Sequence, residues 1–262
     1  CTRIATITLP DHLGEFRSTA FEGCDSIKEI KVSATNKHYI NDENGILYKK
    51  EENSTALTEL LFYPKGLAKE NNGVINNLPS TLTTIGGSAF SNNNYLVSVT
   101  IPASVTVIDN NAFSECGSLK EVVFVAGGTT LRIGDSAFAS CTELATIDLP
   151  SYTTAIGASA FANCVLTSFT VPEKVTVIGK AAFYKCVNLE EVTFKCDGAL
   201  TIGKDATHIS TGAFSGCVAL KSISLPAGTT EIGKYAFYEC KAMESADLGS
   251  SVTMINTYAF GR

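Results

Sequence analysis

The sequence is poor in several residues that mark common catalytic and metal sites. It has no tryptophan, two methionines and three histidines, and charged residues make up only 18% of its 262 positions. His12, His38 and His208 lie far apart, in segments where we expect exposed turns, so neither a Cys-His nor a Ser-His-Asp site is indicated. The sequence has no Cys-x-x-Cys pair and no histidine near its cysteines, which argues against a zinc site. We therefore predict a protein that is not an enzyme and needs no metal or cofactor.

Basic stripes and long apolar runs are missing as well. The formal net charge is −6 and the pI is near 5.2, so no basic surface is indicated that would release counterions from nucleic acid or an anionic membrane. No apolar run approaches the roughly 18 residues that a membrane helix needs. Glycines are spaced by a repeat and do not form a nucleotide-binding fingerprint. Nucleic acid and membrane insertion are therefore not expected for this segment.

What the sequence does have is a repeat of about 23 residues, marked by the dipeptide Ala-Phe. The phenylalanines of this dipeptide are Phe21, Phe90, Phe113, Phe138, Phe161, Phe183, Phe214, Phe237 and Phe260. Isoleucine stands five residues before each of them from Phe90 onward, at Ile85, Ile108, Ile133, Ile156, Ile178, Ile209, Ile232 and Ile255, and Phe16 takes this place in the first unit. We expect equivalent side chains to lie one above another in stacked coils, because no 23-residue unit can bury a core alone.

Most of the cysteines follow the same repeat. They stand three residues after the phenylalanine, at Cys24, Cys116, Cys141, Cys164, Cys186, Cys217 and Cys240. Asn93 replaces cysteine in one unit, Cys1 aligns with Cys141, and Cys196 lies outside the pattern. Equivalent side chains in stacked coils point in parallel, whereas a disulfide needs facing Cβ atoms. We therefore predict a buried column of reduced thiols, in which Asn93 contacts backbone amides.

Within each unit the pattern predicts two short strands and a turn. Alternating apolar and polar residues indicate a strand at Val99–Ile101, Ile147–Leu149 and Ile223–Leu225, and a second extended piece follows, as at Val105–Ile108 and Val175–Ile178. The residue after the isoleucine that precedes each Ala-Phe is Gly, Asp, Ser or Asn, which favours a helix N-cap or a left-handed turn. We expect a single helical or 3₁₀ turn to carry Ala-Phe-x-x-Cys, with an irregular turn in the first unit, where Arg17 stands at that position.

The fold predicted from this pattern is a repeat solenoid of the leucine-rich-repeat kind, made mostly of short β-strands. We expect one domain over residues 1–262, with irregular, hairpin-like coils at about 28–78 and an insertion at about 196–208. The chain begins and ends within a repeat, so we expect it to be a fragment of a longer array.

The repeat also resembles a known family. The pattern Cys-x-x-Leu-x-x-Ile-x-Leu-Pro-x-x-Val-x-x-Ile-Gly-x-x-Ala-Phe is nearly intact from Ala139 to Tyr184 and from Gly216 to Phe260. It resembles the BspA-like leucine-rich repeats, also called the Treponema pallidum type, of bacterial surface proteins. This resemblance implies a right-handed, curved superhelix that is secreted or displayed on the cell surface and takes part in adhesion to host matrix or other cells.

The candidate binding surface is the polar side of the first strand of each unit, because the strand side of a curved solenoid often binds partners. Its main column is Thr100, Val123, Asp148, Thr170, Thr193, Ser224 and Asp247, beside a second column of Ser98, Glu121, Thr146, Ser168, Glu191 and Ser222. A merely solvated sheet face is the plainer interpretation. Tyr39, Tyr48 and Tyr63 are a rival contact site if they are exposed.

Our leading hypothesis is a monomeric interaction or adhesion module that binds a protein or another cell-surface ligand. A carbohydrate-binding module is the first alternative, and it would need exposed aromatic platforms. A passive stalk that projects another domain is the second.

Overall fold

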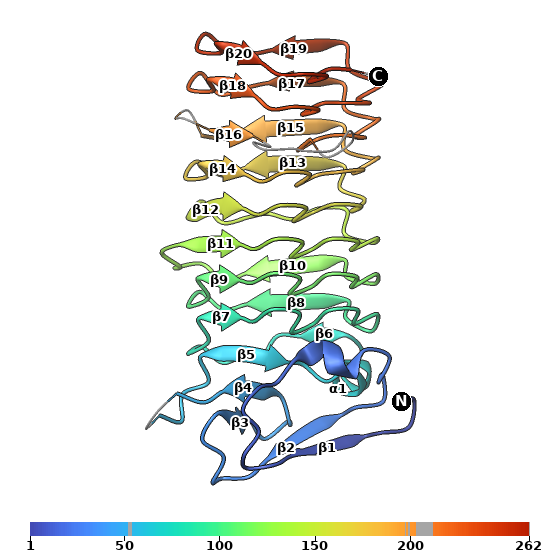
Figure 1. The fold of residues 1–262 in the computed structure, drawn as a ribbon, viewed down its shortest axis with the longest axis vertical. Helices are drawn as coiled ribbons and strands as arrows, with labels where there is room; N and C mark the ends of the chain where they lie inside the picture. The colour runs from blue at the N-terminus through green and yellow to red at the C-terminus, as the bar shows by residue number, and fades with distance from the viewer. Residues whose placement is uncertain (52–53, 197, 199, 203–211, 262) are drawn as a thin grey trace.

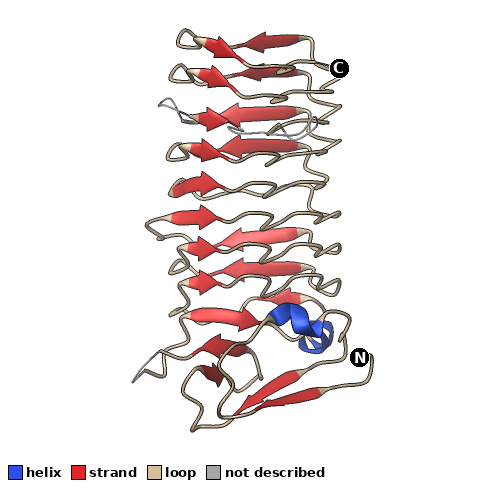
Figure 2. Ribbon diagram, viewed as in Figure 1, coloured by secondary structure: helices blue, strands red, loops and turns tan. Residues whose placement is uncertain are grey.

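The computed structural model describes residues 1–51, 54–196, 198, 200–202 and 212–261. Coils stack along one axis, with the N-terminal coils at one end and the C-terminal coils at the other (Figure 1). Figure 2 shows that strands and turns dominate. Among the described residues there is one α-helix, α1 (Lys65–Glu70), and one 3₁₀ helix, Ser18–Phe21. The repeat solenoid predicted from the 23-residue pattern is therefore confirmed.

One long sheet runs through the stack and is built from the second extended piece of each unit. Its eleven strands lie in the order β20 (Met254–Ile255), β18 (Glu231–Ile232), β16 (Thr201–Ile202), β14 (Val177–Ile178), β12 (Thr153–Ile156), β11 (Leu131–Ile133), β9 (Val107–Ile108), β7 (Thr84–Ile85), β5 (Glu59–Phe62), β4 (Leu47–Lys49) and β3 (Tyr39–Asn41). From β5 to β20 the pairing is parallel and places each isoleucine beside its equivalent, as Ile85 lies beside Ile108. From Ile85 to Ile232 the isoleucine column is thus buried in the core, whereas Ile255 in the last strand is exposed.

The first strands of the units form four shorter sheets. They pair β1 (Thr6–Leu9) with β2 (Glu29–Val32); β6 (Val74–Ile75), β8 (Ser98–Ile101) and β10 (Glu121–Phe124) with one another; β13 (Ser168–Val171) with β15 (Glu191–Phe194); and β17 (Ser222–Ser224) with β19 (Ser245–Asp247). We call the solvent-facing side of β6 to β19 in these sheets the strand face. The strand predicted at Ile147–Leu149 is not formed, so that prediction was wrong. Residues 146–149 lack ladder hydrogen bonds to the coils on both sides, and alternation alone does not make a strand.

A stack of aromatic rings fills the centre of the coils. Neighbouring rings are nearly parallel, with centroids 4.8–5.5 Å apart, along Phe90, Phe113, Phe138, Phe161, Phe183, Phe214 and Phe237, and Phe260 continues the stack at 5.2 Å. Phe21 does not belong to it. Its ring contacts Phe16 and Phe62 in a separate N-terminal core, and Tyr63 occupies the first place of the stack instead.

The Ala-Phe corner is made of successive tight turns rather than a helical turn. In most coils the residues two before and two after the phenylalanine have positive φ, as Ser136 (φ 53°) and Ser140 (φ 60°) do around Phe138. Left-handed residues at this spacing interrupt a right-handed helical run. The single 3₁₀ helix lies in the first unit, where Arg17 led us to expect irregularity. Glycine after the isoleucine serves close packing: a Cβ on Gly157 would lie 2.5 Å from the carbonyl carbon of Gly134.

The N-terminal coils close one end of the stack with an antiparallel arrangement. β3 pairs with β4 and β4 with β5, both antiparallel, and α1 follows β5. Tyr39, Tyr48 and Tyr63 are buried here, with at most 7% of their surface exposed. The proposed tyrosine contact site is therefore wrong, because Tyr48 and Tyr63 pack in the main core and Tyr39 packs in the separate N-terminal core instead of facing solvent.

The inserted residues leave the isoleucine column intact, although with a different member. Ile202 in β16 pairs with Ile178 on one side and with Ile232 on the other. The sequence pattern had placed Ile209 there, and Ile209 itself lies outside the described residues. Cys196 and Leu200, within the predicted insertion, are buried. The part of the insertion from 203 to 208 also lies outside the described residues.

Candidate functional site

The strand face carries six of the seven predicted binding residues on β-strands. Parallel register sets Thr100 beside Val123, Thr170 beside Thr193, and Ser224 beside Asp247. Thr100 and Thr170 are half-buried and the other four are exposed. Asp148 is exposed too, but it lies in the segment 146–149 that forms no strand. The structure therefore joins these residues in three adjacent pairs, with Asp148 between the first and second pairs along the chain.

Few of these side chains bond to one another. The Ser224 hydroxyl donates to Asp247 Oδ2 at 3.4 Å, and the Thr193 hydroxyl donates to Glu191 Oε1 at 3.4 Å. Two ion pairs between neighbouring coils involve the lysines that directly precede β10 and β17. They join Lys120 Nζ to Glu143 Oε2 at 3.3 Å and Lys221 Nζ to Glu190 Oε2 at 2.5 Å. The hydrogen bond that the Lys221 ammonium donates to Glu190 raises the pKa of Lys221. Most hydroxyl and carboxylate groups of the face thus remain available to a partner.

An opening divides the strand face beside Asp148. It has a volume of about 290 Å³ and lies between β10 and residues 146–149. Its lining includes Lys120, Glu121, Val123, Thr146 and Asp148. The sequence analysis did not anticipate this opening. The spacing of the phenylalanines does change around this coil. The interval from Phe113 to Phe138, before the coil of Asp148, is 25 residues, and the interval from Phe161 to Phe183, after it, is 22 residues.

The predicted thiol column is present but is not a reactive site. Six of its thiols donate a hydrogen bond to the carbonyl of the phenylalanine in the preceding coil: Cys116 to Phe90, Cys141 to Phe113, Cys164 to Phe138, Cys186 to Phe161, Cys217 to Phe183 and Cys240 to Phe214, with Sγ–O distances of 3.0–3.3 Å. Cys24, predicted in the same column, packs in the separate N-terminal core instead. The cysteines of this column are free thiols, and Cys1 is the exposed cysteine of the chain. Burial raises the pKa of Cys116 and of Cys240 to about 12, which suppresses the nucleophilic thiolate.

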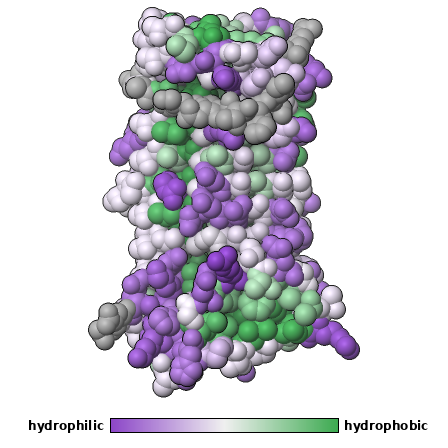
Figure 3. Space-filling view, in the orientation of Figure 1, coloured by the Kyte–Doolittle hydropathy of each residue, from purple (hydrophilic) through white to green (hydrophobic). Residues whose placement is uncertain are grey.

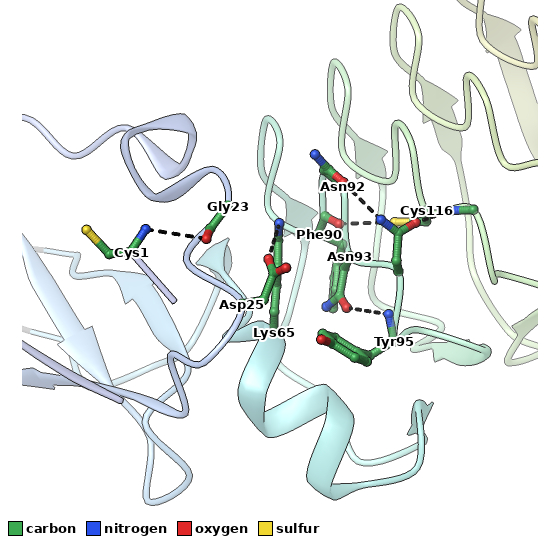
Figure 4. Close-up of polar contacts among 11 residues, drawn as sticks. Cys1, Gly23, Asp25, Lys65, Phe90, Asn92, Asn93, Tyr95 and Cys116 are labelled. Atoms are coloured by element: carbon green, nitrogen blue, oxygen red, sulfur yellow. Dashed lines mark hydrogen bonds and ion pairs between the residues drawn. The ribbon is translucent and has the colours of Figure 1, made fainter. Parts of the chain in front are cut away.

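Asn93 stands at the head of the thiol column, next to Cys116 (Figure 4). Its Oδ1 accepts a hydrogen bond from the backbone N–H of Tyr95 at 3.2 Å, so the predicted contact with a backbone amide exists. Its Nδ2 is buried and has no hydrogen-bond partner. Nearby, Lys65 is 5% exposed and pairs with Asp25 Oδ1 at 3.2 Å, tying α1 to the first coils (Figure 4). These are structural contacts rather than the parts of a catalytic site.

The remaining chemistry that the sequence raised is dispersed. His12 and His38 are exposed, and His208 lies outside the described residues. In the part of the chain that the structure describes, no three His, Cys, Asp or Glu side chains gather as a metal site would require. The helices of that part are too short or too polar to cross a membrane.

Figure 3 shows one side of the column, on which polar side chains are spread along the coils and the largest hydrophobic patch lies near the N-terminal end. An open, polar side that extends over many stacked coils is the geometry of a repeat protein with an extended surface, not of an enclosed active site. The class of protein defined by this fold is a leucine-rich-repeat solenoid.

The chain belongs to the BspA-type leucine-rich repeat family. The family model for the BspA type leucine rich repeat region matches residues 1–45, 72–190 and 198–262. The segment 46–71, which it leaves out, contains β4, β5 and α1. The resemblance that the repeat pattern indicated is therefore confirmed.

Solved structures of leucine-rich repeat proteins share the fold. One from Bacteroides ovatus is 28% identical, with a TM-score of 0.61 over 83% of this chain and 53% of that one. One from Eubacterium ventriosum is 22% identical, with a TM-score of 0.55 over 98% and 58%. The Treponema pallidum leucine-rich repeat protein is 22% identical, with a TM-score of 0.51 over 85% of both chains. The chain thus spans little more than half the length of the first two. No protein of curated function matches the sequence.

Proposed function

We propose that this chain is a non-catalytic interaction module, displayed on the cell surface or secreted, that binds a protein or another macromolecule of a host or neighbouring cell. The observation that supports it most is the parallel register of the strand face. Successive coils present equivalent side chains that are exposed or half-buried, such as Val123 beside the half-buried Thr100 and Asp247 beside Ser224. A surface of this kind gains affinity by contacting a partner at many coils.

The family supports the same proposal. The chain is made of BspA-type leucine-rich repeats, and its resemblance to this family implies adhesion at the cell surface. The thiols of the column are buried, and the exposed His12 and His38 lie far from them in sequence, so no nucleophile is paired with a base among these groups of the described chain, which agrees with a binding role.

The carbohydrate-binding alternative gains little support from the strand face. Its main column holds hydroxyls, carboxylates and Val123, and the tyrosines of the rival contact site, Tyr39, Tyr48 and Tyr63, are buried. Phe124 and Phe194, at the ends of β10 and β15, are half-buried and pack against the core. A protein partner is therefore preferred to a glycan, which would need flat exposed rings for stacking.

Binding to immobilised matrix proteins and to intact host cells tests the proposal. We expect saturable binding by the wild-type chain. A double charge swap on the strand face, Asp148→Lys with Asp247→Lys, should weaken binding at least tenfold. Glu173→Lys changes the charge at an exposed turn after β13 and serves as the matched control. Absence of binding to any matrix protein, cell or glycan array would leave only the stalk interpretation and would overturn the proposal.

A further inference from the structure

One edge of β10 faces the opening, and no other strand among the described residues pairs with that edge. At the two ends of the β8–β10 pair, the N–H of Glu121 donates to the O of Val97, the residue before β8, at 3.3 Å, and the N–H of Val125 donates to the O of Ile101, the last residue of β8, at 2.9 Å. Because backbone groups alternate in direction along a strand, those of Val122 and Phe124 point to the other edge, toward the opening. β10 is the last strand of its sheet on that side.

The opposite wall of the opening is equally unpaired. The N–H and C=O groups of residues 146–149, all of which the structure describes, take part in no backbone hydrogen bond. Next to this segment, on the side of the following coil, the N–H of Thr167 donates to Ala145 O at 3.1 Å, while the turns and the long sheet hold the two coils together elsewhere. A strand edge with unpaired N–H and C=O groups is a template for another extended chain.

The charges around the opening are negative. Glu121 and Asp148 line it, and neither carboxylate belongs to an ion pair among the described residues. The one lysine in the lining, Lys120, is already paired with Glu143 at 3.3 Å. Val123 lines the same opening with 42% of its surface exposed, and it offers an apolar contact. The opening therefore complements a segment that is extended, partly apolar and positively charged.

We propose that the opening between β10 and residues 146–149 binds a short, extended segment of a partner protein that carries a lysine or arginine. The segment adds backbone hydrogen bonds to the free edge of β10, its cation lies between Glu121 and Asp148, and an apolar side chain contacts Val123. This inference rests on the proposed function and names the chemistry of the partner. The volume of about 290 Å³ suits a few residues of a peptide and is too small for a folded element.

Fluorescence anisotropy with labelled eight-residue peptides tests this assignment. The probe alternates valine and arginine, and two matched peptides replace arginine by glutamate or methylate alternate backbone nitrogens. We expect saturable binding of the arginine peptide, at least tenfold weaker binding of the N-methylated peptide, and none of the glutamate peptide. Equal affinity for the arginine peptide and its N-methylated form would overturn the proposal, because backbone pairing would then contribute nothing.

Charge-removing variants locate the binding. Asp148→Asn and Glu121→Gln keep the side-chain shape, and each should weaken binding of the arginine peptide about tenfold. Asp247→Asn removes the same charge from the same face, outside the opening, and should change binding less than twofold. Equal losses in Asp148→Asn and Asp247→Asn would mean general attraction to an acidic protein and would overturn the assignment.

The two proposals fail separately. If the chain binds matrix or cells through the strand face but not the peptide, the peptide site is wrong and the interaction module stands. If the peptide binds as described and no macromolecular partner is found, the opening stands as a peptide site and adhesion is wrong.

Discussion

Tyr63 stacks on Phe90 with ring centroids 5.1 Å apart and planes 25° apart, so that a tyrosine outside the Ala-Phe repeat begins the central stack of rings. Its hydroxyl accepts a hydrogen bond from Asn71 Nδ2 at 3.3 Å, which satisfies the polar end of a ring that is 1% exposed. The N-terminal coils thus close the aromatic stack with a ring whose polar end still has a partner. The stack that follows depends on each ring having neighbours on both sides.

Phe161→Ala should destabilise the protein by about 3–5 kcal/mol, because it leaves a cavity in the middle of the stack. Phe161 is fully buried, and its ring lies 5.4 Å from Phe138 and 5.5 Å from Phe183. A urea titration followed by circular dichroism measures the change. Phe260→Ala is the matched control, because Phe260 is 39% exposed and has one stacked neighbour, and its loss should be clearly smaller. A loss under 1 kcal/mol for Phe161→Ala would contradict this picture of the core.

The columns of the core could be predicted from the sequence because each repeats one residue type at one spacing. The stacked phenylalanines, the isoleucines and the thiols all lie where that spacing put them from Phe90 onward. The exceptions occur where the spacing changes. Tyr63 replaces Phe21 and Ile202 replaces Ile209, because pairing between coils, and not distance along the chain, decides which side chain enters a column.

The candidate surface was harder to predict for a related reason. The alternation in residues 146–149 is as regular as in β8, yet a strand needs hydrogen-bond partners in adjacent coils, and local sequence carries no information about them. Phe169 occupies the inward position that Val192 holds in the next coil, and its ring contacts both Phe161 and Phe183. The strand face is therefore interrupted at residues 146–149, in the coil that lies next to the large Phe169 side chain and between coils of 25 and 22 residues.

Asn93→Cys should stabilise the protein by about 1–2 kcal/mol. The buried Nδ2 of Asn93 has no partner, and leaving such a group unsatisfied costs roughly 1–3 kcal/mol. A thiol at this position matches the side chain that the column otherwise uses. Cys164→Asn is the reciprocal change and should destabilise by about 2 kcal/mol, since it places an amide where Cys164 now donates to Phe138 O at 3.1 Å. Equal stability of the wild type and Asn93→Cys in urea would show that the amide finds a partner, such as water.

The thiol column should make the protein sensitive to alkali. Burial raises the pKa of Cys116 to about 12 from an ordinary value of 9.0, so the folded state holds the proton that the unfolded state releases. The stabilisation is therefore complete below pH 9 and is lost as the pH rises toward 12, by up to about 1.4 kcal/mol per pH unit for one thiol. Cys116→Ser removes this titration. Its free energy of unfolding, measured at pH 8, 9, 10 and 11, should fall less steeply than that of the wild type, and parallel curves would contradict the assignment.

Gly157→Ala should destabilise the protein by about 2 kcal/mol or more, because the coils approach one another too closely there for a methyl group. The added Cβ would lie 2.5 Å from the carbonyl carbon of Gly134 and 2.7 Å from the backbone nitrogen of Asp135, and backbone atoms cannot rotate away as a flexible side chain can. The two coils would have to separate. That movement would weaken the hydrogen bond that the N–H of Gly157 donates to Ile133 O at 2.9 Å.

Gly14→Ala separates this packing effect from the general effect of replacing glycine. A Cβ on Gly14 would meet no atom within 4 Å, so the substitution should change the free energy of unfolding by less than about 0.5 kcal/mol, or raise it slightly by restricting the unfolded chain. Thermal and urea unfolding of the two variants, with amide hydrogen exchange in β12 and β14, measure both the loss and its location. If Gly157→Ala were as stable as Gly14→Ala, the spacing between coils would be adjustable, and close backbone packing would not explain why glycine follows the isoleucine in this repeat.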